Sequence, residues 1–302
     1  MRKNKPSATA LLILKSIVFA SQDPQLKPFV PQDLVDISKA LICSQTLNGV
    51  MFWKACGGPW YRIGIKILER FFLPGIILHY ILRKRYIEEV THSLLSEGVT
   101  QVVILGAGFD PLAFRLSQLY PQVDFFELDH PQTQELKKES FSAVGLGFSH
   151  KVTFIPIDLI DQSLAESLLD CPTFNSQAKC LFILEGLTMY LKEENVNNLF
   201  HSMGKVSSPL SFFVFTFMDR QKNGSLQFKS ASPLVDLWLR IKNETFQWGL
   251  SQDELARFLP SQQLRLIHLI TDETLRELYL SQYPQETLLA KGEYICLSQR
   301  VP

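Results

Sequence analysis

The chain has 302 residues, of which 46% are hydrophobic, so it is long enough for one large α/β domain or one domain with a sizeable cap. Thirty Lys and Arg residues balance thirty Asp and Glu residues, which gives no reason to expect a nucleic-acid surface or an acidic partner. The five cysteines are scattered, with no CxxC pair and no metal-ligand spacing, which predicts a reducing, cytoplasmic compartment and mostly buried thiols.

Residues 1–100 are expected to form a mainly helical N-terminal cap that contributes to the substrate region. Residues 8–20 allow two interpretations, because a basic segment and an apolar run resemble a secretory signal, whereas Lys15 interrupts that run. No disulfide framework follows, so a helix packed against the domain is favoured. Residues 33–47 and 83–95 carry apolar residues at helical spacing and are predicted to be helices.

Large apolar residues crowd the segment between those two helices. They could line a substrate pocket, but core packing is the favoured interpretation. Four of them are aromatic: Trp53, Trp60, Phe71 and Phe72. The apolar stretch 71–82 is short and contains Pro74, so no membrane span is expected there.

From residue 101 the pattern changes to a strand followed by a glycine turn. Residues 102–105 are consecutively apolar, which is typical of a strand buried on both faces of a parallel sheet. Gly106 and Gly108 then allow a sharp turn and the close approach of a ligand to bare backbone. Asp110 and Pro111 follow as helix N-cap and first helical residue, with the positive helix end facing the same space. This arrangement predicts a shelf for a nucleotide-like cofactor.

A second strand supports that prediction and leaves two cofactors open. Residues 123–126 lead to Asp129, about 20 residues beyond the glycines, where this fold places an acid against a ribose. Both a dinucleotide and S-adenosyl-L-methionine contain a ribose that this acid could bind. A dinucleotide site also requires a third glycine three residues after the second, and this chain has Pro111 at that position. S-adenosyl-L-methionine, which carries no phosphate, is therefore favoured over NAD. An NAD-dependent oxidoreductase is correspondingly disfavoured.

The rest of the chain alternates between strands and helices, which predicts an α/β fold with a mostly parallel sheet. The expected strands are residues 102–105, 123–126, 152–157, 180–184 and 212–217, with helices between them at 112–119, 131–143, 162–169 and 193–206. Further on, we expect helices at 234–241, 252–259 and 274–283, and strands at 264–269 and 294–297, the last one antiparallel. Residues 101–302 are thus expected to form the cofactor-binding core.

Several motifs in this order resemble the leucine carboxyl methyltransferase family, which includes bacterial O-methyltransferases of polyketide and other secondary-metabolite pathways. The matching segments are residues 83–87 (RKRYI), 103–110 (VILGAGFD), 126–131 (FELDHP), 184–191 (LEGLTMYL) and 248–250 (WGL). The resemblance implies the Rossmann-like, seven-stranded class I methyltransferase sheet with its final strand antiparallel. It also implies S-adenosyl-L-methionine as cofactor.

The resemblance assigns cofactor-binding roles to residues at the ends of three strands. Gly106 and Gly108 would let the methionine part lie over the turn. Asp129 would take both ribose hydroxyls. Asp158 and Leu159 would hold the adenine amine and ring.

Two further positions complete the implied site. Arg83, with Arg85 as second choice, would hold the carboxylate of the cofactor. Glu185 would lie near the transferred methyl and the amino group. No catalytic residue is assigned, although Glu185 and Tyr190 are candidates for positioning, and Tyr190 and Met189 are otherwise expected in the core.

Each polar candidate also has a structural interpretation. Asp110 is expected to be a helix cap, Glu127 a structural ion-pair partner and Asp158 a turn residue. Three histidines could act as bases but are expected to be bystanders: His79, His130 and His201.

The motifs therefore predict an S-adenosylmethionine-dependent O-methyltransferase acting on a small molecule or on a protein C-terminal carboxylate. A carboxylate acceptor is ionised at neutral pH and needs no base, whereas a phenol does. Because no dedicated base stands out, a carboxylate is mildly favoured over a hydroxyl. A non-catalytic binding protein on the same fold is the alternative from a different class. The acceptor cavity is expected to be walled by the N-terminal helices and residues 221–259, and the oligomeric state is left open.

Overall fold

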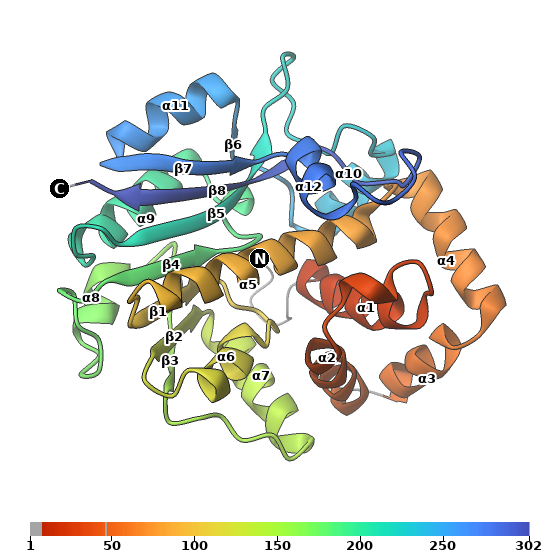
Figure 1. Cartoon of the computed structure of the whole chain (residues 1–302), viewed down its shortest axis with the longest axis horizontal. Helices are drawn as coiled ribbons and strands as arrows, with labels where there is room; N and C mark the ends of the chain where they lie inside the picture. The colour runs from red at the N-terminus through yellow and green to blue at the C-terminus, as the bar shows by residue number, and fades with distance from the viewer. Residues whose placement is uncertain (1–7, 46, 302) are drawn as a thin grey trace.

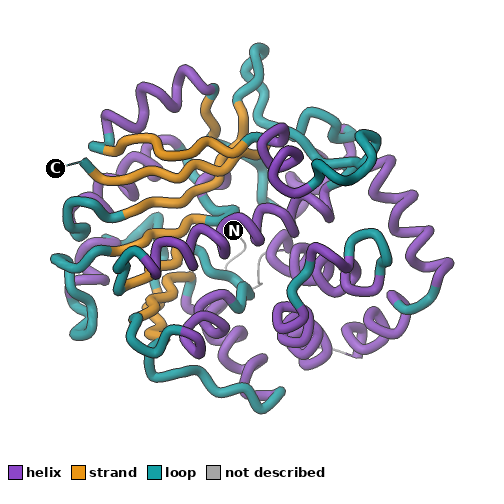
Figure 2. Tube along the Cα trace, viewed as in Figure 1, coloured by secondary structure: helices purple, strands orange, loops and turns teal. Residues whose placement is uncertain are grey.

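The computed structural model describes residues 8–45 and 47–301, and one mostly parallel sheet with helices on both faces organises them (Figures 1 and 2). The strand order is β3-β2-β1-β4-β5-β8-β7, and the short β6 pairs with β5. The strands are β1 Gln101–Leu105, β2 Asp124–Asp129, β3 Val152–Pro156, β4 Cys180–Leu184, β5 Phe212–Asp219, β6 Gly249–Leu250, β7 Leu264–Ile270 and β8 Glu293–Arg300. The expected α/β class is confirmed, and β8 runs antiparallel to both of its neighbours.

Two apolar layers cover the two faces of the sheet. In β1, Val102 and Ile104 point into one cluster while Val103 and Leu105 point into the other, as the alternation of a strand requires. The first cluster includes residues of α5 Ile76–Ser96, α6 Leu112–Leu119 and α12 Asp272–Tyr279. The second includes residues of α8 Leu164–Leu169, α9 Glu193–Lys205 and α11 Gln252–Ser261. Burial on both faces explains why the central strands are continuously apolar.

The remaining helices precede β1 or lie in the connections between strands. They are α1 Ala8–Gln22, α2 Gln32–Gln45, α3 Leu47–Cys56, α4 Pro59–Phe72, α7 Pro131–Ala143 and α10 Pro233–Lys242, with short 3-10 turns at Lys27–Phe29 and Thr188–Tyr190. The helix expected at residues 8–20 is confirmed as α1, whose buried residues include Leu14, Ile17 and Phe19. No helix among the described residues is long and apolar enough to cross a bilayer.

Several predicted boundaries were wrong. The helix expected at residues 83–95 begins at Ile76, directly after Gly75, whose φ of 77° ends the preceding turn. Strand β2 continues to Asp129 instead of ending at residue 126, because Glu127 finds a buried ionic partner and can stay within the strand. Helix α12 ends at Tyr279, four residues earlier than expected.

The expectation that the early aromatic residues fill the core was wrong for most of them. Trp60 and Phe71 are 83% and 74% exposed, and Phe72 is 40% exposed, while Trp53 is half-buried. The reason lies in α4, whose inward side is taken by Tyr61 and Ile65. Trp60 and Phe71 lie on another side of α4 and are exposed to solvent.

A buried ion pair fastens the glycine turn to the sheet. Lys137 Nζ of α7 lies 2.6 Å from Glu127 Oε2 of β2, and both side chains are 1% exposed. The same ammonium donates to the carbonyl oxygen of Asp110 at 2.6 Å. Burial raises the pKa of Glu127, although the charge of Lys137 opposes the rise. The structural role expected for Glu127 is confirmed.

We expect Lys137→Met to destabilise the fold by about 3–5 kcal/mol, because it leaves a buried carboxylate without a partner. Urea unfolding at neutral pH measures the change. Lys138→Met is the matched control, since Lys138 is exposed and only approaches the ring of Phe154, and it should shift the free energy of unfolding by less than about 1 kcal/mol. Equal losses from both substitutions would contradict the structural role of the pair.

Candidate functional site

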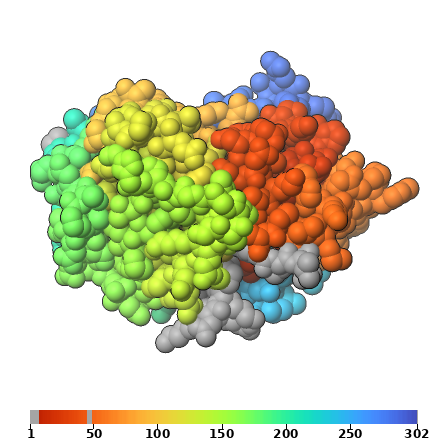
Figure 3. Space-filling view, turned by 90° about the horizontal axis from the view of Figure 1, so that it is seen from below, coloured from red at the N-terminus to blue at the C-terminus, as the bar shows by residue number. Residues whose placement is uncertain are grey.

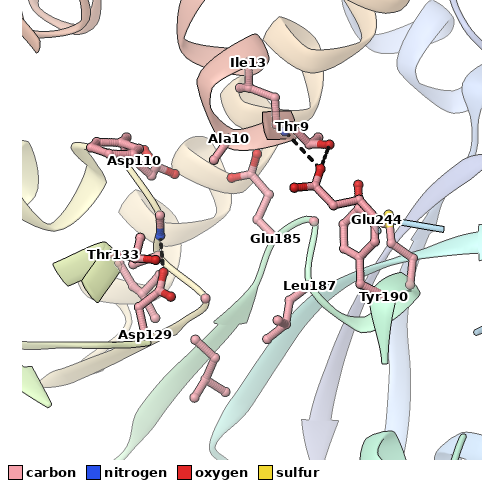
Figure 4. A pocket seen from close by; sticks show the side chains of 18 of the residues that line it. Thr9, Ala10, Ile13, Asp110, Asp129, Thr133, Glu185, Leu187, Tyr190 and Glu244 are labelled. Atoms are coloured by element: carbon pink, nitrogen blue, oxygen red, sulfur yellow. Dashed lines mark hydrogen bonds between the residues drawn. The ribbon is translucent and has the colours of Figure 1, made fainter. Parts of the chain in front are cut away.

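A cavity of about 400 Å³ opens at the carboxyl ends of the central strands. Its lining includes the glycine turn, residues 157–160 after β3, and residues 183–191 around the end of β4. Helix α1 contributes Thr9 and Ile13, and the segment after α10 contributes Glu244 and Phe246. Both parts of the chain that were predicted to wall the acceptor cavity therefore contribute to the lining of this cavity. Figure 4 shows Asp129 on one side, Tyr190 and Glu244 on the other, and Glu185 between them.

The glycine turn has the conformation that its residues suggested. Gly106 and Gly108 have φ of 66° and 51°, a region that residues with side chains rarely adopt. A Cβ at Gly106 would come within 3.0 Å of Leu187 Cδ1. Both glycines line the cavity, so backbone rather than side chain faces the space above the turn.

Asp129 closes the same end of the cavity. Its Oδ2 accepts a hydrogen bond from Gly108 N, and its Oδ1 accepts one from His130 N, both at 2.6 Å. A carboxylate has about four acceptor positions, so both oxygens retain capacity for further donors. Burial raises the pKa of Asp129, and the two backbone hydrogen bonds partly offset that rise.

Asp158 and Leu159 also line this end of the cavity, after β3. Asp158 Oδ1 accepts a hydrogen bond from Ile160 N at 3.0 Å, and its own N–H donates to Gln162 Oε1 at 2.8 Å. The turn interpretation is confirmed, and the same turn places both residues at the cavity.

Arg83 lies in the cavity wall but is already paired with two carboxylates. Its Nε donates to Glu185 Oε1 at 3.0 Å, and one terminal nitrogen donates to both oxygens of Glu293 at 2.8 and 2.9 Å. Burial alone would lower the pKa of Arg83, but the two carboxylates outweigh it and the guanidinium stays charged. Arg85 pairs with Glu89 at the surface and does not line the cavity.

Lys84 is a site residue that the sequence interpretation missed. Its Nζ lies 2.7 Å from Asp110 Oδ2 and 3.2 Å from Glu185. Asp110 also accepts a hydrogen bond from Leu112 N at 3.2 Å. The predicted cap was wrong by one residue, because α6 begins at Leu112 and its N-cap is Pro111, so Asp110 precedes the cap and acts as an ion-pair partner. The basic run of residues 83–85 indicated that a cation could lie here, but it did not show which of the three side chains would face the cavity.

The far end of the cavity is aromatic and acidic. Tyr80, Tyr190, Phe228 and Phe246 line it, and the rings of Tyr190 and Phe246 lie 5.5 Å apart. Tyr190 lines the cavity and also packs against an apolar cluster that contains the buried Met189, which lines the cavity too. Burial raises the pKa of Tyr80 and of Tyr190, so both phenols stay protonated.

Glu244 connects this end of the cavity to the first turn of α1. Its Oε1 accepts a hydrogen bond from Ala8 N at 2.8 Å, and its Oε2 accepts one from Thr9 N at 3.0 Å. The carboxylate thus satisfies free amide groups at the positive helix end. Nothing in the sequence pairs residues 236 positions apart, so this contact was not predicted.

The histidines occupy three different environments. His79 is fully buried, and its Nε2 lies 2.8 Å from Glu293 Oε2 without lining the cavity. His130 lines the cavity beside Asp129, and His201 is exposed.

The charges of the cavity suit a ligand that carries positive charge. Among the described lining residues, Arg83 and Lys84 face six carboxylates: Asp110, Asp129, Asp158, Glu185, Glu244 and Glu293. A sulfonium is favoured in such a field. Bare backbone at the turn and free acceptor capacity on Asp129 complete the requirements of S-adenosyl-L-methionine, so the residues fit this cofactor.

Comparison with known proteins now decides the family. The model of the leucine carboxyl methyltransferase family matches residues 20–204. The chain belongs to that family. Membership confirms the resemblance of the motifs and makes the chain a methyltransferase with S-adenosyl-L-methionine as cofactor.

Individual relatives agree with this family. YktD of Bacillus subtilis (strain 168), provisionally named an S-adenosyl-L-methionine-dependent methyltransferase, is 28% identical over 293 residues, covering 93% of each chain. A Mycobacteroides abscessus protein with the same provisional name is 29% identical over 168 residues, covering 54% of this chain and 55% of that protein. The crystal structure of a DUF574 family protein from Streptomyces avermitilis covers 97% of this chain and 98% of its own, with a TM-score of 0.56 and 13% identity, which shows the fold alone.

The ionic network of this methyltransferase predicts a specific response to acid. Burial would raise the pKa of Glu293, but the charge of Arg83 outweighs it and holds that pKa at about 2. The carboxylate thus contributes stability that is complete above pH of about 4.5 and is lost as pH falls toward 2. We expect Glu293→Gln to cost roughly 3 kcal/mol at pH 7 and to flatten the pH dependence of stability in that window.

Urea unfolding between neutral pH and pH of about 3 measures this effect. Glu286→Gln is the control, because Glu286 is exposed, and it should retain the slope of the parent chain. An unchanged slope in Glu293→Gln would show that this carboxylate is not held ionised by Arg83.

Proposed function

We propose that the chain is an O-methyltransferase whose acceptor is the hydroxyl of a small, flat phenol or enol. The observations that carry this proposal are the aromatic end of the cavity and the pairing of its cations: among the described lining residues, both Arg83 and Lys84 are already paired with carboxylates. Bound S-adenosyl-L-methionine would supply an electrophilic methyl group on a sulfonium. The residues of the chain must bind it, orient the acceptor and exclude water.

The cofactor would lie along the strand ends. We assign the ribose to Asp129, whose oxygens retain acceptor capacity, and the adenine to Asp158 and Leu159. Gly106 and Gly108 would leave room for the methionine part. We assign no catalytic role to these residues, because they would only position the cofactor and supply charge beside it.

The amino-acid end of the cofactor would meet the ionic network. Arg83 donates to Glu185 and Glu293 and has little capacity left, so its contact with the cofactor carboxylate would use its last free N–H. Lys84 lies beside it and could share that role. Glu185 would face the amino group, as an anion must.

The charge of the acceptor end favours a neutral acceptor over a carboxylate. Burying a carboxylate without a cationic partner is strongly unfavourable. Glu244 and Glu293 would repel it, and Arg83 is already paired. The same argument disfavours a protein C-terminal carboxylate. The structure thus moves our preference from the carboxylate, which the sequence mildly favoured, to the hydroxyl.

We propose an acidic hydroxyl because no strong base stands out among the described residues that line the aromatic end of the cavity. His130 lines the cavity too, but it lies beside Asp129, on the side away from Tyr190 and Glu244. Both oxygens of Glu244 accept hydrogen bonds from α1, and the pKa of Glu293 is held at about 2. Tyr80 and Tyr190 stay protonated and can only donate to the acceptor oxygen. A phenol or enol loses its proton far more readily than an aliphatic alcohol, so it depends least on a base.

Asp129→Ala should weaken binding of S-adenosylhomocysteine by about 1–3 kcal/mol, because hydrogen bonds to a charged group are lost. Isothermal calorimetry gives the affinity. Asp124→Ala is the control, since Asp124 begins the same strand but pairs with Lys151 at the surface, and it should bind as the parent chain does. Unchanged affinity in Asp129→Ala would refute the ribose assignment, and tighter binding of NADH than of S-adenosylhomocysteine would refute the cofactor.

Methyl transfer from labelled cofactor to a panel of phenols, enols and aromatic carboxylates tests the acceptor class. We expect products whose label resists mild alkali, because methyl ethers are stable where methyl esters release methanol. The value of kcat/KM should rise with pH up to the acceptor pKa of about 10, or lower for activated phenols. Products that lose their label in mild alkali would be methyl esters and would identify the acceptor as a carboxylate. Cofactor binding without transfer to any acceptor would favour a non-catalytic binding protein.

A further inference from the structure

Helix α4 carries an apolar stripe on its outward side. Trp60, Ile63, Ile67 and Phe71 are spaced by three and four residues, which aligns them along one side of a helix. All four are exposed, between 47% and 83%, and no residue of α4 is buried. Figure 3 shows the orange segment that contains α3 and α4 projecting at one edge of the molecule.

Two neighbouring helices extend this apolar surface. Leu234, Leu237 and Ile241 form an exposed stripe on α10, and Met51 is exposed on α3. The backbone N–H of Ser232 donates to the carbonyl of Phe72 at 2.8 Å, which joins the end of α4 to the start of α10 (Figure 1). Ten of the twenty large exposed apolar residues in the described ranges lie on α3, α4 and α10, which we call the α3–α4–α10 face. Patches of this kind mark interaction sites.

The charges of this face have one sign. Every exposed charged residue that the structure describes on the three helices is basic: Lys54, Arg70, Arg240 and Lys242. Their two acids, Glu69 and Asp236, are half-buried. Glu69 is directed inward, since its Oε1 accepts a hydrogen bond from Ile77 N at 3.0 Å.

We propose that the α3–α4–α10 face binds the surface of an anionic lipid bilayer. Helices that lie in a membrane interface combine an apolar side containing Trp, Phe and Leu with Lys and Arg beside it, and anionic headgroups attract the cations. A second copy is a poorer occupant. A two-fold contact through this face would bring basic side chains of both copies together with no exposed acid on these helices to pair with them.

The α3–α4–α10 face lies next to the acceptor end of the cavity. Phe228 and Met189, which line the cavity, share one apolar cluster with Leu73, and Val235 of α10 packs against that cluster. Asn243, which ends α10, lines the cavity too. A lipid surface at this face would therefore present lipophilic acceptors close to the site, a consequence that rests on the proposed function.

Flotation of the full chain with vesicles tests lipid binding without any methyl transfer, so its failure is distinct from a failure of the proposed function. We expect binding to vesicles of phosphatidylglycerol and phosphatidylcholine in equal parts, weaker binding to phosphatidylcholine alone, and release by salt. Ile67→Asp/Phe71→Asp should lower the partition coefficient about tenfold or more, and Arg70→Glu/Arg240→Glu should remove the preference for anionic vesicles.

Leu119→Asp/Leu169→Asp is the matched control, because both leucines are exposed on other helices, at 65% and 59%, and this variant should bind as the parent chain does. Circular dichroism verifies that each variant is folded. Absence of vesicle binding by the parent chain, or equal binding by the α4 variant, would overturn the proposal. A dimer of the parent chain that Ile67→Asp/Phe71→Asp separates would assign the face to a second copy instead.

Discussion

The position of α5 against the strand ends depends on one buried ionic network. Arg83 and Lys84, adjacent in α5, pair with Glu185 after β4, Glu293 at the start of β8 and Asp110 after the glycine turn. Buried charges are tolerated only when they are paired, and removing one partner typically costs several kcal/mol. The network therefore allows one placement of α5 and fixes three separate parts of the sheet edge around the cavity.

The same network shapes the chemistry of the cavity. Because the carboxylates that surround Arg83 and Lys84 outnumber them, the cations support the fold and leave a negative field in the open space. Such a field attracts a sulfonium and repels an anionic acceptor. One set of residues thus favours binding of the cofactor and, under the proposed function, selects a neutral second substrate.

The sequence was sufficient for features that depend on neighbouring residues. The strand–turn–helix at Gly106 and Gly108, and the acid at Asp129, follow from local pattern and from the topology of parallel sheets. It was insufficient where partners lie far apart in the chain. Glu293 is 210 residues from Arg83, and no local rule pairs them. Trp60 and Phe71 were expected in the core because they are large and apolar, but those properties do not say which side of a helix faces the sheet, and both residues are exposed on α4.

Glu244 shows how these distant contacts combine. It follows Asn243, which ends α10, and its carboxylate holds the first turn of α1 over the cavity. One wall of the cavity is therefore formed by α1 and by a segment from the last third of the chain, and the side chain of Glu244 connects the two. The outer side of α10 belongs to the α3–α4–α10 face, and Asn243, which ends this ten-residue helix, lines the cavity. Close-packed interiors transmit strain, so α10 physically links that face to the cavity.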